Sequence, residues 1–385
     1  MSMCSRSPVK IVKSKSHVHN KRSAQYMKTD TSETAAPPRL VHKLKPAAGD
    51  QLISNLINMK EQRKLTYIQF FKQHCCYDLL PSSSKLVILD TELSIQKAFF
   101  ALVFNNVRAS ILWNSTSQRF IGMLTITDFI KILVNDYGKH NGIMDDYGNS
   151  TITKWRSMDK STENQSLISV SPESNLYDAA RKLIKYRCHR LPIIDHVYGN
   201  PLYILTHKRI LNYLHLNRNV LPQDTFMSKS LEDLRLGTYM PEVHTISKEA
   251  PIIDALRLFV EHHISCLPVV DSENRLVELY AKFDAFNLAV TRTYHNLDET
   301  IYSALGFHRA NRERYPKPMT CLKTATLNFV IERMVNSGIH RLVIVDSKNR
   351  LEGIISLSDI LRFIVQSHTK TNTREENHSR VPTHS

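Results

Sequence analysis

Two short polar motifs recur along this chain, each at the end of an apolar segment, where ligand-binding residues are commonly found. The first motif precedes a short apolar strand, and its four copies read Val107-Arg108, His189-Arg190, Ser265-Cys266 and His340-Arg341. Arginine presents a planar fork of N–H donors that matches phosphate oxygens, and histidine and lysine add positive charge. The first motif therefore predicts contacts with phosphate groups.

The second motif lies where an apolar strand is expected to lead into a helix. Its copies read Leu124-Thr125-Ile126-Thr127-Asp128, Leu205-Thr206-His207-Lys208-Arg209, Tyr280-Ala281-Lys282-Phe283-Asp284 and Ile355-Ser356-Leu357-Ser358-Asp359. A carboxylate can accept two hydrogen bonds from a ribose diol, and the N–H groups at a helix N-terminus favour polar or anionic ligands. Together the two motifs are complementary to a nucleotide.

Both motifs also have a structural interpretation. Asp and Thr at the start of a helix are ordinary N-caps that need no ligand. A single Arg or His is more often a solvated surface charge or an ion-paired core residue. Recurrence in four copies favours ligand binding, because the second copy replaces the carboxylate by Arg209 and is still followed by an equally good helix pattern.

The chain lacks the motifs of several other functional classes. It has no glycine-rich phosphate loop, which disfavours a P-loop ATPase or a dinucleotide-binding domain, and nothing resembles a kinase catalytic loop. The six cysteines form no CxxC pair, and the histidines lack zinc-ligand spacing. We therefore expect no metal site and no disulfide framework.

Composition is that of a globular chain with polar ends. The 385 residues are 42% hydrophobic and carry a net charge of +15, which is compatible with an anionic partner such as nucleic acid, a membrane surface or a phosphorylated small molecule. The basic N-terminal tail lacks interleaved aromatic residues, so no nucleic-acid partner is expected. No run approaches a membrane span and no signal peptide is evident, which predicts a cytoplasmic protein, with a nuclear fraction left open. Residues 1–50 and 368–385 are polar and are predicted to be disordered tails.

The elements that position the two motifs repeat four times. Four segments carry apolar residues at i, i+3, i+4, i+7 and i+8, the pattern of an amphipathic helix. They are Ile95, Ala98, Phe99, Leu102 and Val103; Leu176, Ala179, Ala180, Leu183 and Ile184; Ile252, Ala255, Leu256, Phe259 and Val260; and Leu327, Val330, Ile331, Met334 and Val335. Each is followed by two short strands and a second helix, and a short strand precedes the first helix. The predicted unit is β-α-β-β-α, and units of this size are expected to pack in pairs.

The repeat resembles the CBS motif, and the four-copy arrangement is similar to the gamma-subunit family of AMP-activated protein kinase. The segments that carry the resemblance are 123–129, 189–195, 202–211, 226–239 and 355–361. The resemblance covers about residues 65–367. It implies an α/β (α+β) fold of four CBS repeats, paired into two Bateman modules that form a flat disc. The implied repeats span 65–145, 160–220, 238–295 and 315–367.

The resemblance also implies three nucleotide sites. Asp128, Asp284 and Asp359 would hold riboses, whereas Arg209 would leave the second repeat without a site and direct its charge toward the phosphates. Residues implied to face the phosphates are Arg108, His189, Arg190, Lys208, Thr238, Ser265, Arg309, His340, Arg341, Ser356 and Ser358. Further implied nucleotide-binding residues are Met123, Leu124, Thr125, Ile126, Thr127, Ile168, Cys266, Ala281, Lys282, Phe283 and Leu357. His263 and Cys75 stand where relatives carry arginine, which bears on affinity.

The implied function is regulatory and non-catalytic. AMP, ADP and ATP would compete for the sites and control a kinase catalytic alpha subunit, in a heterotrimer with a scaffolding beta subunit and without a catalytic cofactor. Residues 65–80, which precede the first repeat, are expected to form a strand that pairs with the beta subunit. Two alternatives stay open: a CBS-domain regulator of another enzyme or channel that binds an adenosyl ligand, and a gamma-like scaffold without nucleotide control.

Overall fold

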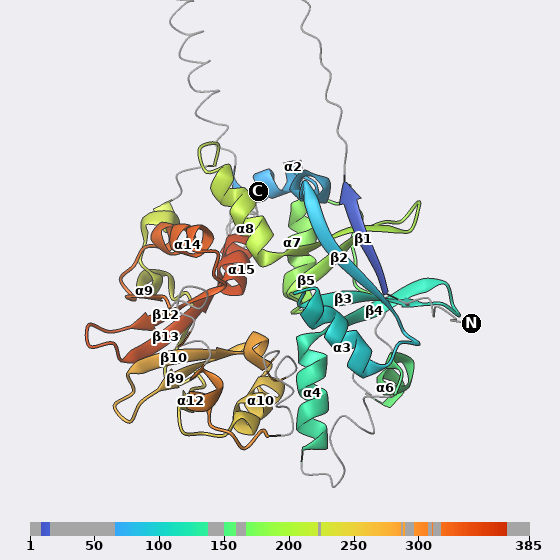
Figure 1. Ribbon diagram of the computed structural model, residues 1–385. Helices are drawn as coiled ribbons and strands as arrows, with labels where there is room; N and C mark the ends of the chain where they lie inside the picture. The colour runs from blue at the N-terminus through green and yellow to red at the C-terminus, as the bar shows by residue number, and fades with distance from the viewer. Residues whose placement is uncertain are drawn as a thin grey trace, which may run out of the picture.

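The computed structural model describes residues 9–15, 66–137, 150–158, 167–221, 225–285, 288, 296–306, 310 and 317–367. Within these ranges the chain forms four similar units, which we number repeats 1 to 4 (Figure 1). In each repeat a first strand or bridge runs parallel to a middle strand, which pairs antiparallel with a third strand. The predicted α/β fold of β-α-β-β-α units is confirmed.

The four repeats differ in the lengths of their elements. Repeat 1 comprises β2 (Ser83–Asp90), α3 (Ile95–Phe104), β3 (Ala109–Asn114), β4 (Arg119–Thr125) and α4 (Ile126–Asp136). Repeat 2 comprises the bridge residue Val170, α7 (Leu176–Lys185), β5 (Arg190–Asp195), β6 (Asn200–Thr206) and α8 (His207–Leu216). Repeat 3 comprises β8 (Ile246–Ser247), α10 (Ile252–Glu261), β9 (Cys266–Val270), β10 (Leu276–Ala281) and the 3-10 turn η3 (Lys282–Asp284). Repeat 4 comprises β11 (Thr320–Cys321), α14 (Leu327–Asn336), β12 (Arg341–Val345), β13 (Leu351–Ser356) and α15 (Leu357–Ser367).

The four predicted helix stripes are confirmed as the buried faces of α3, α7, α10 and α14. In every stripe the first four apolar side chains are buried, and the fifth is partly buried. Burial of a Leu, Ile or Phe side chain contributes roughly 1.5–3 kcal/mol. The stripes therefore account for much of the stability of each repeat.

A short linker helix packs each repeat against its neighbour. These helices are α2 (Tyr67–Gln73), α6 (Ile152–Met158), α9 (Leu231–Leu234) and α12 (Ile301–Ala304), and each precedes one repeat in the sequence. Four isolated bridges beside them are Cys75 with Asn175, Ser94 with Thr151, Ser230 with Thr326 and Pro251 with Thr300. Each bridge joins a linker to the start of the first helix of the other repeat in a pair, 1 with 2 or 3 with 4. The chain thus crosses over within each pair.

Residues 65–80 do not form the predicted strand. From Thr66 on they form α2 and the 3-10 helix η1 (Cys76–Leu79), while Leu65 lies outside the described residues. Thr66 caps the helix, its Oγ1 accepting the Gln69 N–H at 3.2 Å while the Gln69 side chain accepts the Thr66 N–H at 2.9 Å. The buried side chains Tyr67, Phe70 and Phe71 follow i, i+3, i+4 spacing, which favours a helix over a strand.

The structure also differs from the sequence prediction near the N-terminus. Val9–Lys15, within the segment predicted to be disordered, forms β1 and pairs antiparallel with β2 over seven positions. The sequence of β1 combines three β-branched residues with three lysines, a composition typical of an edge strand. The rest of residues 1–50, and the predicted tail 368–385, lie outside the described residues.

Two large apolar cores join repeats across the pairs. One core combines side chains of repeats 1 and 3, such as Phe99, Phe129 and Phe259. The other combines repeats 2 and 4 with the aromatic residues of α2. Figure 1 shows repeats 3 and 4 on the left and repeat 1 on the right, with α15 of repeat 4 beside α8 of repeat 2 near the centre. Each repeat therefore contacts one neighbour through its sheet and another through its helices.

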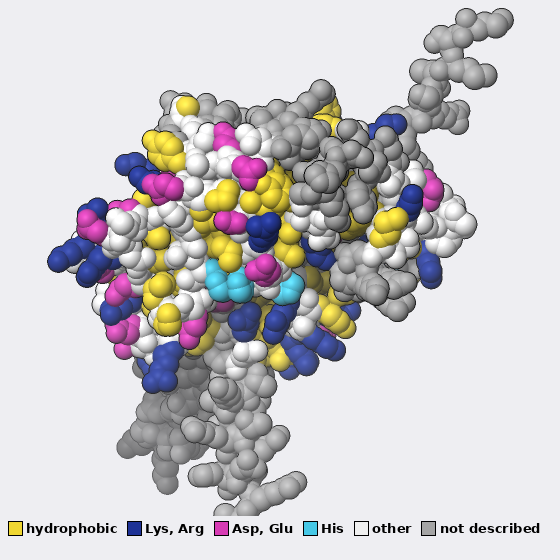
Figure 2. Space-filling view, turned by 90° about the horizontal axis from the view of Figure 1, so that it is seen from below, with side chains coloured by type: hydrophobic (Ala, Val, Ile, Leu, Met, Phe, Trp, Pro, Cys, Tyr) yellow, Lys and Arg dark blue, Asp and Glu magenta, His cyan; other side chains and the backbone are white. Residues whose placement is uncertain are grey.

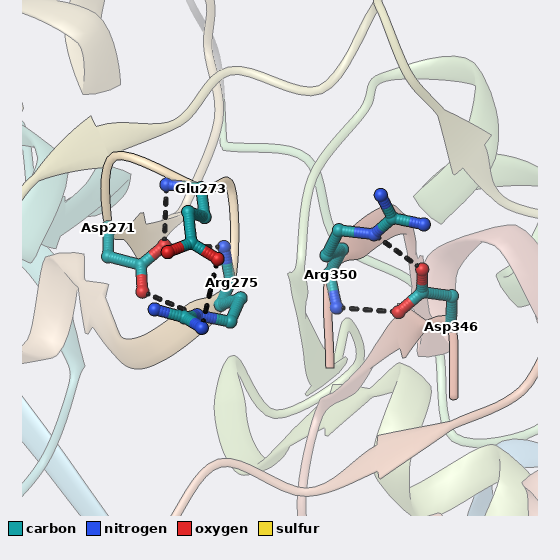
Figure 3. A network of polar contacts seen from close by, with 5 residues as sticks. All are labelled: Asp271, Glu273, Arg275, Asp346 and Arg350. Atoms are coloured by element: carbon teal, nitrogen blue, oxygen red, sulfur yellow. Dashed lines mark hydrogen bonds and ion pairs between the residues drawn. The ribbon is translucent and has the colours of Figure 1, made fainter. Parts of the chain in front are cut away.

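The sheets of repeats 3 and 4 meet at two interlocked turns (Figure 3). In each turn an aspartate binds an arginine four residues later: Asp271 Oδ2 with Arg275 Nε at 2.8 Å, and Asp346 Oδ2 with Arg350 Nε at 2.7 Å. The turns also exchange backbone hydrogen bonds, since Leu276 N–H donates to Asn349 O and Leu351 N–H donates to Asn274 O. This exchange fixes the register between repeats 3 and 4.

Candidate functional site

The strand register brings the two polar motifs together in every repeat. The first residue of each middle strand pairs with the last residue of the third strand: Ala109 with Thr125, Arg190 with Thr206, Cys266 with Ala281, and Arg341 with Ser356. The residue before each middle strand therefore lies beside the start of the helix or turn that follows the third strand. Each repeat presents one such polar corner.

The register corrects the alignment of the first motif by one residue. Because Ala109 occupies the place of Arg190 and Arg341, Arg108 is equivalent to His189, Ser265 and His340. The same result follows by counting five residues from the end of each helix stripe, which leads from Val103 to Arg108 and from Ile184 to His189. Repeat 1 thus carries its cation one position earlier than repeats 2 and 4 carry their arginine.

The carboxylates of repeats 1, 3 and 4 are bound to the backbone at these corners. Asp128 Oδ2 accepts the Thr125 N–H at 2.7 Å, Asp284 Oδ2 accepts the Ala281 N–H at 2.7 Å, and Asp359 Oδ2 accepts the Ser356 N–H at 2.9 Å. In repeats 1 and 4 the hydroxyl of the capping residue also donates to the same oxygen. The capping role is therefore real, and it orients each carboxylate without using Oδ1 in these bonds.

Arg209, the counterpart of these aspartates in repeat 2, does not direct its side chain toward the other cations. Its Nη1 donates to Leu79 O at 3.1 Å, and its guanidinium lies 5.6 Å from the Tyr203 ring centroid. Tyr203 in turn donates from its hydroxyl to Cys76 O at 2.5 Å. The guanidinium of Arg209 therefore fastens η1 to repeat 2 and does not join the other cations, whereas the expectation was that it would direct its charge toward the phosphates.

Cations from all four repeats meet where the corners converge. Arg108 Nη1 of repeat 1 lies 3.5 Å from His340 Nε2 of repeat 4, and its guanidinium lies 4.4 Å from the Phe283 ring centroid. Lys208 Nζ donates to Gly338 O at 2.8 Å, and Lys282 Nζ donates to Thr127 Oγ1 at 3.3 Å. Each of these contacts crosses between repeats, so the four corners lie beside one another and share one group of cations.

Arg341 completes this group of cations from repeat 4. Its Nη1 and Nη2 donate to Ser265 O at 3.2 Å and to Ser265 Oγ at 3.1 Å. None of the ion pairs seen in the described ranges involves Arg341 or the cations of the previous paragraph. A concentration of positive charge of this kind is suited to an anionic ligand.

Burial and the repulsion between neighbouring positive charges lower the pKa values of several of these side chains. Burial, followed by the charge of Arg108, lowers the pKa of Arg190 to about 10. Burial is the main reason that the pKa of His340 falls to about 3. The positive charges of Arg108, Arg341, Lys208 and Arg190 lower it further. Burial and the neighbouring Arg190 also lower the pKa of His189. The histidines of the site are therefore neutral hydrogen-bonding groups at physiological pH, and its charge comes from Arg and Lys.

Asp128 lies close to two cations that sequence reasoning missed. Burial raises the pKa of the Asp128 carboxyl, and the Thr125 hydrogen bonds and the charges of Lys131 and Arg156 oppose that rise. Lys131 lies on α4, one turn after Asp128, and Arg156 lies on the linker helix α6. Helical spacing could have revealed Lys131, whereas only the fold brings Arg156 to repeat 1.

The remaining predicted residues are distributed around the corners. The side chains of Leu124, Cys266 and Leu357 are buried, so their backbone groups are what they can offer a ligand. Thr238 lies on β7 (Thr238–Tyr239), which extends the sheet of repeat 4 by pairing with β13. Met123, Ile126, Ile168 and Ser358 lie on or beside the elements that form the corners. Arg309 lies outside the described residues.

Other kinds of site are not evident in the part of the chain that the structure describes. There, no group of three or more His, Cys, Asp or Glu side chains could hold a metal ion, and the cysteines are free thiols. No helix among those residues has the length and apolar character to cross a membrane. The face in Figure 2 mixes basic, acidic, histidine and apolar side chains, unlike the single-sign basic stripe of a nucleic-acid interface.

Three of the four repeats match a known domain family. A family model described as the CBS domain matches residues 162–216, 234–286 and 314–366, which overlap repeats 2, 3 and 4. Repeat 1 has the same element order without a match to that model.

Curated relatives are similar over most of the described chain. The 5'-AMP-activated protein kinase subunit gamma-3 of Homo sapiens is 42% identical over 301 residues, 78% of this chain and 61% of the relative. Its Sus scrofa counterpart is 43% identical over 301 residues, 78% of this chain and 58% of the relative. This chain therefore spans about three fifths of the length of these relatives.

A solved structure has a similar fold. It is the crystal structure of a Methanocaldococcus jannaschii protein described as an archaeal homologue of g-AMPK, with a TM-score of 0.57 and 18% identity. The similarity covers 75% of this chain and 99% of the archaeal chain. At this level of identity the comparison supports the fold alone.

Proposed function

We propose that this chain, which is homologous to the gamma subunits of 5'-AMP-activated protein kinase, is a non-catalytic regulatory subunit that binds adenine nucleotides at its CBS repeats. The relatives are named as subunits of an AMP-activated kinase, which makes AMP the first ligand to test. The proposal covers AMP, ADP and ATP as competing ligands, and kinase alpha and beta chains as partners.

The observation that carries the proposal is the meeting of cations from all four repeats beside three backbone-bound carboxylates. Arg and Lys side chains at this junction suit phosphate groups, which they can bind through charge-assisted hydrogen bonds. Asp128, Asp284 and Asp359 are oriented by their capping bonds and suit a ribose diol. A nucleotide presents both groups at once.

We propose three sites, one at each carboxylate, with no site at the Arg209 corner. Arg209 lacks a carboxylate and is engaged with Leu79 and Tyr203. The domain division expected from the sequence, with repeats 1 and 2 and repeats 3 and 4 as two Bateman modules, belongs to the same proposal. The sheet contacts within each pair support it.

Regulation would follow from the shared cations. AMP, ADP and ATP differ in phosphate number, and each would draw the Arg and Lys side chains away from their present partners in other repeats. Because those partners belong to other repeats, the bound species would bias how the repeats sit against one another and against a kinase. Linkage then requires that a kinase state favoured by AMP also strengthens AMP binding.

The test is calorimetric titration of AMP and ATP into the purified protein and its Asp128→Ala variant. We expect Asp128→Ala to lose one site, or to weaken it by roughly 10- to 100-fold, because a charged acceptor is removed. The matched control is Asp254→Ala, which removes a half-exposed carboxylate on α10. Absence of nucleotide binding by the parent protein would contradict the proposed function, and co-purification with kinase alpha and beta chains tests the partners.

A further inference from the structure

In repeats 1 and 4 a glycine lies three residues before Thr125 or Ser356, the residue that precedes the second helix. In both repeats other atoms lie close to this glycine. Gly122 on β4 and Gly353 on β13 pair with the equivalent residues Leu112 and Ile344 of the middle strands. A methyl group on Gly353 would lie 2.7 Å from Thr238 O and 3.0 Å from Tyr239 Cδ1. In repeat 4 the absent side chain therefore makes room for β7, which carries one of the predicted nucleotide-binding residues.

In repeat 1 the same place is taken by a side chain from a linker helix. A methyl group on Gly122 would lie 2.9 Å from Arg156 Nη1, 3.1 Å from Nη2 and 3.2 Å from Cζ. These three similar distances mean that the guanidinium lies against the glycine backbone. Gly122 directly precedes the Met123–Thr127 segment, and Arg156 interacts electrostatically with Asp128.

We propose that Arg156 is a positioning residue of the Asp128 site, where its guanidinium, seated on Gly122, supports the carboxylate that would bind the ribose of an adenine nucleotide. The inference rests on the proposed function, because it assumes a nucleotide at Asp128. It adds a residue from outside repeat 1 and outside both polar motifs.

The positive charge of Arg156 favours the ionised form of the Asp128 carboxylate. The carboxylate is partly buried, which disfavours its charged form, and it must be ionised to accept two hydrogen bonds from a diol without itself donating. The charged groups that face it are Lys131 on its own helix, Arg156 on α6 and Lys282 on η3. Arg156 is the arginine among them, so its charge does not depend on pH in the working range.

The experiment measures AMP affinity from pH 5.5 to 8 in the full chain carrying Asp284→Asn and Asp359→Asn, which leaves Asp128 as the one proposed site with a carboxylate. In this background affinity should fall as the pH falls and Asp128 becomes protonated. Arg156→Gln should move the midpoint of that fall upward relative to the parent background, because a nearby positive charge that favours the ionised carboxylate is lost. Arg156→Lys should restore most of the parent profile.

Gly122→Ala provides an independent variant that leaves Arg156 in the chain. The added methyl group would displace the flexible end of Arg156 instead of the backbone, so it should shift the midpoint in the same direction as Arg156→Gln. The double variant should shift no further than Arg156→Gln alone, since Gly122→Ala acts by displacing Arg156. Arg181→Gln, which changes an exposed arginine on α7, should leave the profile unchanged, and thermal unfolding of every variant reports its folding.

The outcomes separate this inference from the proposed function. AMP binding with an unshifted midpoint in Arg156→Gln, or additive shifts in the double variant, would overturn the role of Arg156 and leave the nucleotide proposal intact. If the parent background fails to bind AMP while the unmodified chain binds it, the Asp128 site itself is wrong. Failure of the unmodified chain to bind AMP would overturn both.

Discussion

At the scale of single residues, Lys282 is the group of the candidate site whose charge depends most directly on pH. Its Nζ donates to Thr127 Oγ1 of another repeat. Burial lowers the pKa of Lys282 to about 8, an effect that Asp128 opposes and that Lys131 and Arg341 reinforce. His340 contributes little charge above pH 6, because its pKa lies at about 3.

We expect AMP affinity to decline as the pH rises through about 8, because Lys282 then loses the proton that attracts phosphate. Lys282→Arg should remove this decline, since arginine stays charged, and Lys282→Gln should lower affinity at pH 7. Titration of AMP at several values between pH 7 and 9.5 measures the effect, with the surface variant Lys248→Gln as control. A decline of the same size in Lys282→Arg would show that another group is responsible.

The residue types and their positions in the repeat predicted most of the residues of this site. Which of them contact one another depends on the fold. The repeat pattern indicated the polar corners from sequence, because both motifs border recognisable apolar segments. It could not place Arg209, whose guanidinium is directed by a carbonyl of the segment before repeat 1. Nor could it reveal Arg156, which reaches repeat 1 from a linker helix whose partner is set by the crossing of the chain.

At the scale of elements, the sequence predicted a helix or strand correctly where its own residue pattern determines the structure. The prediction failed where a contact with a distant segment of the chain determines it. The four stripes predicted α3, α7, α10 and α14 because their spacing alone defines a buried face. Residues 65–80 were predicted as a strand from resemblance, although the Thr66 cap and the aromatic spacing favour the helix that is present. The pairing of β1 with β2 is a long-range contact that no local pattern specifies.

The interlocked turns of repeats 3 and 4 allow a prediction about which contacts stabilise an element junction. Asn349 has a positive φ of 62° and donates from Nδ2 to Leu276 O at 2.9 Å, whereas Arg350 forms a half-exposed ion pair with Asp346. We expect Asn349→Ala to cost roughly 1–2 kcal/mol of unfolding free energy, because alanine is strained in the left-handed region and cannot replace the hydrogen bond.

Arg350→Ala should cost less than Asn349→Ala, since exposed ion pairs are screened by solvent. Asn349→Gly, which tolerates the backbone conformation, should fall between the two if strain is the larger part of the loss. Denaturant unfolding measures all three variants. A larger loss in Arg350→Ala than in Asn349→Ala would mean that the ion pair, and not the turn geometry, holds the junction.

At the scale of the whole molecule, the two helix cores tie together repeats that belong to different proposed modules. Leu183 on α7 of repeat 2 is 1% exposed, and its core also contains α14 and α15 of repeat 4. We therefore expect Leu183→Asp to destabilise repeat 4 as well as repeat 2, by more than about 4 kcal/mol, because an unpaired charge would enter the shared core. Hydrogen exchange should show lost protection in α14 and α15 together with α7.

Leu216→Asp is the matched control for this prediction, because Leu216 lies at the end of α8 and is 76% exposed. The control should leave protection in repeat 4 unchanged. If Leu183→Asp instead exposed repeat 2 while α14 kept its protection, the modules would unfold independently, and the shared core would contribute little to cooperativity. Joint loss of protection would mean that repeats 2 and 4 unfold as one cooperative unit through the core they share.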